Sequence, residues 1–253
     1  MSTSRAPIGI IGGTGLGRLP ELAQAQRIDC STPYGVPSSA IALGELEGHP
    51  VAFLARHGVP HRIAPHRVNY RANIDALRQL GVREIIALNA VGGIADWAAP
   101  GVLAATDQLI DYTHGRLSSF SDLEGVAVVH SDFSDPYTES LRRALLQAGA
   151  DLGLAVHDGG VMAVTQGPRL ETRAEIEKLR RDGADLVGMT ASPEAPLARE
   201  AGIDYAGLAV VANWAAGRGP EAVITMEEIE HTLEEAMQRA QRVLRRLLGS
   251  RPA

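Results

Sequence analysis

The sequence predicts an α/β fold in which helices flank one large central sheet. The chain has 253 residues, of which 45% are hydrophobic and 21% charged, so it is long enough to bury a substantial core. Short runs rich in Val, Ile, Leu and Ala recur along it and end at Gly, Pro, Asn or Asp, as buried strands do. Helical patterns lie between the later runs, and this alternation is typical of α/β proteins.

Seven segments are predicted to be buried strands. The first, residues 7–11, is a β-branched run that breaks into the glycine-rich turn Gly12-Gly13-Thr14-Gly15. The other six have the same character and span residues 51–55, 84–89, 102–109, 161–165, 186–189 and 205–212.

Four helices are predicted from their end signals, over residues 135–149, 172–183, 192–202 and 225–247. Thr172 with Glu175, and Thr225 with Glu228, have the spacing of a capping box. No internal repeat or linker interrupts the pattern, so residues 1–253 are expected to form a single domain.

Charge and composition exclude several classes of function. Lys+Arg 24 against Asp+Glu 30 gives a net charge of -6, which provides no general attraction for nucleic acid or an anionic membrane. The single cysteine, Cys30, excludes an intrachain disulfide framework and fits a reducing compartment. No apolar stretch approaches the roughly 18 residues of a membrane span. We therefore expect a cytoplasmic protein that acts on small molecules.

The glycine-rich turn at residues 12–17 indicates an anion site, because glycines let backbone amides approach a phosphate closely. It lacks the Lys of a nucleotide P-loop, and Arg18 and Pro20 stand where a dinucleotide fingerprint needs its last glycine. The alternative is a tight turn that binds nothing.

A basic segment follows the strand at residues 51–55. It contains three Arg and three His: Arg56, His57, His61, Arg62, His66 and Arg67. Although His57 and His61 have the spacing of a helical zinc pair, Pro60 between them breaks such a helix, so no metal is expected. An arginine fork beside a histidine suits an oxyanion better, and the alternative is a solvated loop of charges.

Other polar residues follow predicted strands as well. The turn at Asn89-Ala90 and the segments 167–172 and 188–194 would meet at the carboxyl edge of the sheet, where α/β proteins bind ligands. Two of these residues have a purely structural alternative. Glu171 could be a carboxylate that the helix dipole favours at a helix N-terminus, and Met189 could simply pack in the core.

Five segments together resemble the purine nucleoside phosphorylase and methylthioadenosine phosphorylase family: residues 10–15 (IIGGTG), 56–58 (RHG), 69–73 (NYRAN), 167–175 (GPRLETRAE) and 188–194 (GMTASPE). The resemblance runs in the family's order from about residue 8 to residue 213. It implies a doubly wound mixed sheet, a homotrimer, and cleavage of a purine nucleoside by phosphate into free base and a ribose 1-phosphate.

The resemblance also implies roles for individual residues. Phosphate would be held by Thr14, Arg56, His57, Asn89, Ala90 and Thr190. Met189 would lie under the ribose, and His130 resembles a histidine that such trimers lend to the neighbouring subunit's site. Two positions depart from the family: Asn89 stands where Thr is frequent, and Leu170 stands where Phe commonly packs on the purine.

Glu171 and Asn213 predict a 6-oxopurine base. An ionised Glu171 accepts from the N1–H group of hypoxanthine or guanine, and the Asn213 amide donates to O6 while also meeting N7. Methylthioadenosine enzymes typically have Asp at position 213, Asp at the place of Ala215 and Ser at the place of Glu171. Adenosine-type substrates should therefore be poor, because adenine would face an unprotonated carboxylate.

The 5′ end of the substrate is expected to meet Ile224, Thr225 and Met226, where 6-oxopurine enzymes usually place a His. An apolar lining prefers a methylthio group to a hydroxyl, which favours S-methyl-5′-thioinosine as the substrate. The alternative is that Ile224 and Met226 are the first core-facing turn of the last helix.

The predicted enzyme needs no side-chain nucleophile, metal or organic cofactor, with inorganic phosphate as co-substrate. Arg56 would hold that phosphate, while Glu171 and Asn213 would stabilise the departing purine. The predicted role is purine salvage. Alternatives are a general inosine and guanosine phosphorylase, a methylthioadenosine phosphorylase and a non-catalytic purine sensor; a nicotinamide dehydrogenase is disfavoured by the failed glycine fingerprint.

Overall fold

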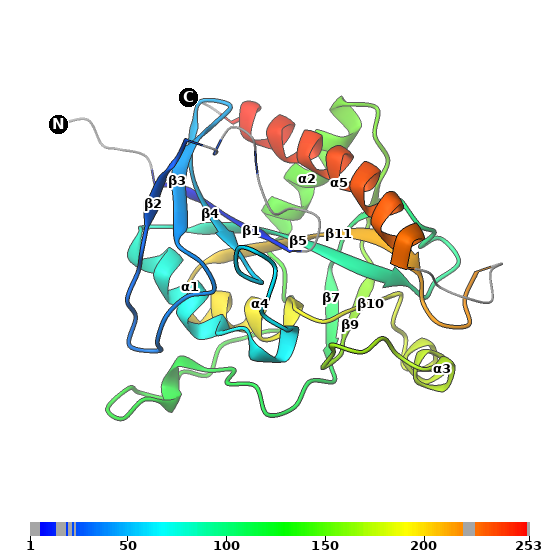
Figure 1. Ribbon diagram of the computed structural model, residues 1–253, viewed down its shortest axis with the longest axis horizontal. Coiled ribbons are helices and arrows are strands. Elements are labelled where there is room, and N and C mark those ends of the chain that lie inside the picture. Colours follow the sequence, from blue (N-terminus) through cyan, green and yellow to red (C-terminus); the bar gives the residue numbers. More distant parts are fainter. Residues whose placement is uncertain (1–5, 14–18, 20–21, 23, 220–225, 252–253) are drawn as a thin grey trace.

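The computed structural model describes residues 6–13, 19, 22, 24–219 and 226–251. The described strands form one 11-stranded mixed sheet that runs through the molecule (Figure 1). In chain order they are β1 (Ile8–Gly12), β2 (Gln26–Ile28), β3 (Ile41–Leu46), β4 (His49–Ala55), β5 (Glu84–Gly93), β6 (Leu103–Ala105), β7 (Gln108–Asp111), β8 (Val156–Asp158), β9 (Val161–Val164), β10 (Leu186–Gly188) and β11 (Asp204–Trp214).

The centre of the sheet is parallel and its margins are mixed. β1 lies between β4 and β5, parallel to both, and β5 also pairs in parallel with β11. β10 runs antiparallel to the end of β5, while β2, β3 and β4 form an antiparallel margin. This arrangement brings the carboxyl ends of β1, β4, β5 and β11 to one edge.

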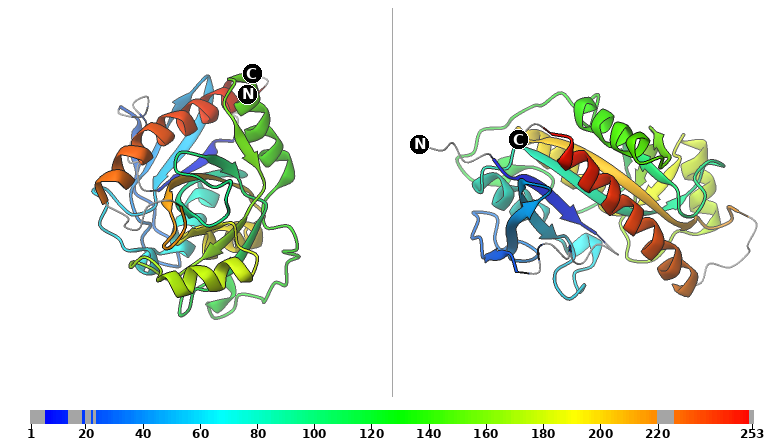
Figure 2. Two further views of the ribbon diagram at one scale, coloured as in Figure 1. Left: turned by 90° about the vertical axis from the view of Figure 1, so that its right-hand side faces the viewer. Right: turned by 90° about the horizontal axis from the view of Figure 1, so that it is seen from above.

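Helices cover both faces of this sheet, which confirms the predicted doubly wound mixed-sheet fold (Figure 2). The longer helices are α1 (Tyr70–Gln79), α2 (Glu139–Asp151), α3 (Arg173–Arg181), α4 (Ala191–Glu200) and α5 (Met226–Gly249), with short 3-10 turns at Pro65–Arg67 and Phe120–Asp122. α2 and α5 share one core cluster with β1, β4 and β11, whereas α1 and α4 share a second cluster on the opposite face.

Local signals account for several boundaries. The Thr172 hydroxyl accepts from the Glu175 amide at 3.1 Å, and the Glu175 carboxylate accepts from the Thr172 amide at 2.7 Å, so the predicted capping box starts α3. On α5, apolar residues at helical spacing, Leu233, Met237, Ala240, Leu244 and Leu247, are buried. Thr225, the predicted cap of α5, lies outside the described residues.

Other boundaries were wrong or unforeseen. The predicted strand at 102–109 is two strands, because β6 pairs with β11 and β8 while β7 pairs with β9. The helix predicted from residue 135 begins instead at Glu139, after Thr138 in an extended conformation. The strands β2, β3 and β8 and the helix α1 were not predicted.

One irregularity in β11 bears on the site. Its register against β5 shifts between Val211 and Asn213, so that Ala212 is an extra residue opposite Gly92. Ala212 stays with the core cluster under α5 and is buried.

Among the described residues, none of the helices combines the length and apolar character that a membrane span requires.

Candidate active site

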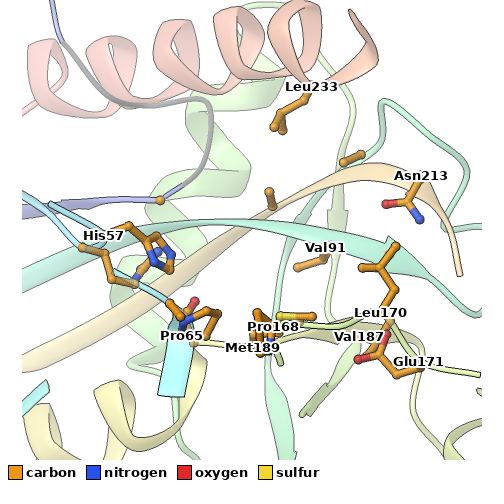
Figure 3. A pocket seen from close by; sticks show the side chains of 18 of the residues that line it. His57, Pro65, Val91, Pro168, Leu170, Glu171, Val187, Met189, Asn213 and Leu233 are labelled. Carbon is orange, nitrogen blue, oxygen red and sulfur yellow. The ribbon is translucent and has the colours of Figure 1, made fainter. Parts of the chain in front are cut away.

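A cavity of about 520 Å³ opens at the carboxyl edge of the central strands. Figure 3 shows His57 and Pro65 toward one end and Leu170, Glu171 and Asn213 toward the other, with Met189 and Pro168 between them. The cavity thus has two chemically different ends: a basic end beyond β4, and a polar end formed by the loop after β9 and the end of β11.

At the basic end, Arg56 is fixed by a buried carboxylate. Its Nε and Nη2 donate to Glu194 on α4 at 2.7 and 2.8 Å, and its Nη1 donates to the Leu88 carbonyl at 3.0 Å. Both side chains are at most 1% exposed. Burial alone would lower the pKa of Arg56, but the Glu194 carboxylate raises it, so the guanidinium stays charged. Arg56 lines the cavity, and three of its five N–H groups are used, which leaves two for an anion.

Gly13 makes room for this arginine. A Cβ atom at Gly13 would lie 2.7 Å from Arg56 Nη1 and 2.9 Å from the Leu88 carbonyl oxygen. The first glycine-rich segment therefore serves the site through the space that it leaves beside the guanidinium. Thr14, which sequence reasoning placed on the phosphate, lies outside the described residues.

His57 is neutral and its hydrogen is on a defined nitrogen. Burial, and then the charge of Arg56, lower its pKa to about 4. Nδ1 lies 2.8 Å from the Ile63 carbonyl oxygen, which only accepts, so Nδ1 carries the hydrogen and Nε2 is an acceptor. The ring stacks on His61 with 4.4 Å between centroids. A neutral ring of this tautomer suits the P–O–H group of monohydrogen phosphate.

Thr190 completes the basic end, supported by Asn89. The Asn89 amide donates to the Thr190 hydroxyl oxygen at 3.0 Å, which leaves the hydroxyl hydrogen for another acceptor. Ala90 and Thr190 line the cavity. The Asn89 side chain, predicted to hold phosphate, is buried and orients the Thr190 hydroxyl through this bond.

The polar end carries the predicted base-recognition residues. Glu171 is half-buried and accepts from the Thr165 hydroxyl at 2.6 Å. The Asn213 amide donates one hydrogen to the Trp214 carbonyl at 2.7 Å, which leaves its second N–H and its carbonyl oxygen for a ligand. Leu170 at the rim is 49% exposed, while Ala215 lies buried in the wall. The amide and the carboxylate face the same end (Figure 3).

Met189 forms the floor between the two ends. It packs against Gly167, where a Cβ atom would lie only 2.5 Å from its sulfur. Gly167 has a φ of +60°, which glycine adopts without strain. The loop that carries Glu171 is therefore seated directly on the methionine.

Arg116, on the long segment between β7 and α2, bonds to the main chain of two segments that follow β9 and β10. Its Nη1 donates to the carbonyls of Met189 and Ser192 at 2.8 and 2.7 Å. Its Nη2 donates to the carbonyls of Thr165 and Gln166 at 3.1 and 3.0 Å. One guanidinium thus holds the ends of β9 and β10 together.

Several predicted residues lie elsewhere. His130 is exposed, on the segment between β7 and α2, and does not line this cavity. Ile224 and Thr225 lie outside the described residues; Met226 begins α5, and its side chain is not described. Leu233 from α5 both lines the cavity and joins the core. Within the described part of the chain, no group of three or more His, Cys, Asp and Glu side chains is arranged to hold a metal ion.

Sequence reasoning assigned no role to Glu194, Arg116 or Thr165. Glu194 and Thr165 lie at the ends of quoted or predicted segments, but their partners are set by the tertiary fold: Arg56 and Glu194 are 138 residues apart. The one local signal for these contacts is Glu194 itself, which lies in a run of buried residues in α4. A buried carboxylate needs a partner, so its position in that run indicates an ion pair.

Comparison with known proteins identifies the class to which this fold and cavity belong. Residues 7–249 match the model of the phosphorylase superfamily. The chain belongs to this family, which confirms the resemblance found in the sequence.

Individual relatives make the comparison more specific. The chain is 53% identical over 236 residues to a probable S-methyl-5′-thioinosine phosphorylase of Xanthomonas campestris pv. campestris, covering 93% of this chain and 94% of the relative. It is 44% identical over 228 residues to a probable 6-oxopurine nucleoside phosphorylase of Thermococcus kodakarensis, covering 88% and 85%. A methylthioadenosine phosphorylase structure from an antarctic soil metagenomic library superposes with a TM-score of 0.89 at 39% identity, covering 97% of this chain and 86% of that one.

Proposed function

We propose that this protein is a phosphate-dependent purine nucleoside phosphorylase that prefers S-methyl-5′-thioinosine. It would release hypoxanthine and 5-methylthioribose 1-phosphate, a step of purine salvage. The observation that carries the proposal is the pairing of Glu171 and Asn213 at one end of a cavity whose other end holds Arg56, His57 and Thr190.

The two ends divide the reaction between them. A phosphate oxygen attacks C1′ while the C1′–N9 bond breaks, and its electron pair leaves with the purine. Phosphate at the Arg56 end acts as nucleophile and as counter-charge to the cationic sugar. The free N–H of Asn213 donates to O6, and Glu171 accepts from N1–H. As the purine leaves with the electron pair, N7 takes a proton from water, and the Asn213 carbonyl oxygen accepts from the N7–H group so formed. Met189 lies between these groups (Figure 3), where it would meet the ribose.

Base choice follows from the donors and acceptors at the polar end. Adenine presents a lone pair at N1 and an amino group at C6, opposite to what Glu171 and Asn213 offer. Such a mismatch in a site built for hydrogen bonds lowers specificity by as much as about 10⁴-fold. The methylthioadenosine alternative is therefore disfavoured.

The 5′ preference rests on the apolar residues around 224–226 and on the name of the 53%-identical relative. The second candidate is a general inosine and guanosine phosphorylase, which the name of the Thermococcus kodakarensis relative supports. The two candidates share the base and differ only in the group at C5′.

Assembly and cofactor use belong to the same proposal. The segment between β7 and α2 exposes Leu117, Val126, Val128 and Val129, with Val128 at 70%, and an apolar surface of this kind suits contact with further copies in a homotrimer. His130 follows directly and would enter the neighbouring subunit's site. We propose phosphate as co-substrate, with neither metal nor organic cofactor, and a cytoplasmic location in keeping with the lone Cys30.

The test compares kcat/KM for 5′-methylthioinosine, inosine, guanosine and 5′-methylthioadenosine, each with and without phosphate. The proposal expects phosphate-dependent base release that is fastest with 5′-methylthioinosine. Equal turnover of inosine would favour the second candidate, and a preference for 5′-methylthioadenosine would overturn the base assignment. Binding without phosphate-dependent release from any of the four would indicate a purine sensor.

A further inference from the structure

The carboxylate of Glu171 is held from behind by a hydroxyl that sequence reasoning did not single out. Thr165 is the first residue after β9, and its Oγ1 lies 2.6 Å from Glu171 Oε1. A carboxylate has no hydrogen to give, so the threonine hydroxyl donates. One carboxylate oxygen is thus engaged by the protein, and Oε2 is the oxygen left to meet a ligand in the cavity.

Thr165 is itself fixed by the sheet. Its amide donates to the Gly188 carbonyl at 2.8 Å, which binds it to the end of β10. Its carbonyl accepts from Arg116 Nη2 at 3.1 Å. Main-chain contacts on both sides therefore hold the threonine, and its hydroxyl transmits that rigidity to the glutamate.

Glu171 needs such support because of where it lies. It follows Leu170, which is 49% exposed, in a loop at the rim of the cavity. A free glutamate side chain loses up to about 2 kcal/mol of rotamer entropy when a ligand orders it. A carboxylate that is already held in place avoids that loss when the base binds.

We propose that Thr165 is a positioning residue for base recognition, which holds Glu171 Oε1 so that Oε2 is presented to the N1–H group of a 6-oxopurine. This inference rests on the proposed function. Thr165 touches no reacting atom; it acts through Glu171. Its effect should therefore appear in nucleoside and base binding and should leave the phosphate end unchanged.

The test uses Thr165→Val, which removes the hydroxyl at nearly constant shape, and Thr165→Ser, which keeps it. Thr165→Val should lower kcat/KM for 5′-methylthioinosine by about 10-fold, mainly through the KM of the nucleoside, as expected for one hydrogen bond to a charged group. The KM of phosphate should stay within about twofold, and Thr165→Ser should restore most of the loss. In a Glu171→Ala background, Thr165→Val should have no further effect, because its partner is gone.

Thr138→Val is the matched control. The Thr138 hydroxyl donates to Asp204 Oδ1 at 3.1 Å and accepts from the Tyr205 amide at 3.1 Å, so the same substitution removes a threonine-to-carboxylate bond, together with this second bond, before α2 and outside this cavity. Its kcat/KM for 5′-methylthioinosine should stay within about twofold of the wild type. An equal loss in the Thr138 and Thr165 variants would overturn the proposal, as would a full effect of Thr165→Val in the Glu171→Ala background.

Calorimetric binding of hypoxanthine separates this inference from the proposed function, because it needs no turnover. Hypoxanthine affinity that falls about 10-fold in Thr165→Val supports the positioning role even if the wild type releases no base from a nucleoside. Unchanged affinity overturns the role even if the wild type is a fast phosphorylase.

Discussion

The two ends of the cavity are built in opposite ways. At the basic end, Arg56 is 1% and His57 7% exposed, and their partners are a buried carboxylate and main-chain carbonyls. At the polar end, Leu170 is 49% exposed and Glu171 and Asn213 are half-buried, on a rim loop and at a strand end. The basic end is therefore buried with the core, whereas the polar end lies at its surface.

This difference separates the reaction from the choice of substrate. Phosphate binding would be tied to fold stability, because the groups that would hold the anion are themselves bonded to buried partners inside the protein. Base recognition would depend on half-buried groups at the rim of the cavity. Changes at the basic end should therefore cost stability together with activity, whereas changes at the polar end should alter only the substrate.

The largest effect is expected from Glu194→Gln, which leaves Arg56 charged and buried without its carboxylate. The free energy of unfolding should fall by about 3–5 kcal/mol, and phosphate-dependent activity should be lost with it. Denaturant unfolding and the KM of phosphate measure the two effects. The control is Glu177→Gln, which removes the exposed partner of Arg180 and should leave the free energy of unfolding nearly unchanged. Equal losses in the two variants would erase the contrast between the ends.

Asn213→Asp should change substrate preference and leave the fold intact. The new carboxylate cannot donate to O6, so kcat/KM for 5′-methylthioinosine should fall by about 10²- to 10⁴-fold while 5′-methylthioadenosine improves. The unfolding free energy should fall by no more than about 1.5 kcal/mol, because the substitution also removes the bond from the Asn213 amide to the Trp214 carbonyl. Steady-state kinetics with both nucleosides provide the measurement; an unchanged ratio would remove Asn213 from base recognition.

The buried His57 should make stability depend on pH. Its pKa is lowered to about 4 in the folded state, chiefly by burial, against about 6.5 in the unfolded chain. Below pH 6.5 the unfolded chain binds a proton that the folded protein does not, so stability is full above that pH and falls on acidification toward pH 4. Between pH 7 and pH 5 this one group should remove about 2 kcal/mol. His57→Gln should show a shallower loss by that amount in unfolding experiments, and parallel curves would contradict the assignment.

The smallest effect is expected at the exposed rim. Leu170→Phe places a ring where the purine enters, and an aromatic contact adds about 0.5–1.5 kcal/mol. The KM of the nucleoside should fall about 2- to 10-fold with the KM of phosphate unchanged. Kinetics at saturating phosphate test this expectation; a change in the KM of phosphate would show that the two ends are coupled.

The fold was largely predictable because its central strands are long apolar runs and because α3 begins with an explicit capping box. β1, β5 and β11 are buried along most of their length, and this leaves a clear pattern in the sequence. The short strands β2 and β8 have three residues each and no fully buried position, so no comparable pattern marks them. α1 escaped notice because its buried positions include Arg71, Asn73 and Asp75, which hides the apolar face of the helix.

The site residues were predictable where polar residues directly follow strands. They were not predictable where a contact with a residue far away in the sequence fixes the side chain. The rule that ligands meet the carboxyl ends of strands brought together Arg56, Ala90 and Thr190. It gave no means of finding the Glu194 and Arg116 contacts, since each joins segments dozens of residues apart. Likewise, the buried position of Asn89 behind Thr190 depends on packing and not on sequence spacing.

The extra residue in β11 has an evolutionary consequence. Ala212 completes the alternating core positions of the strand, and the register shift then sets the direction of Asn213 independently of that pattern. Asn213 is half-buried and lines the cavity, so a substitution there changes the groups that face a ligand and leaves the core cluster under α5 in place. A change of base preference could therefore begin at this one position, before positions 171 and 215 change as well, while Arg56 and His57 keep their buried partners.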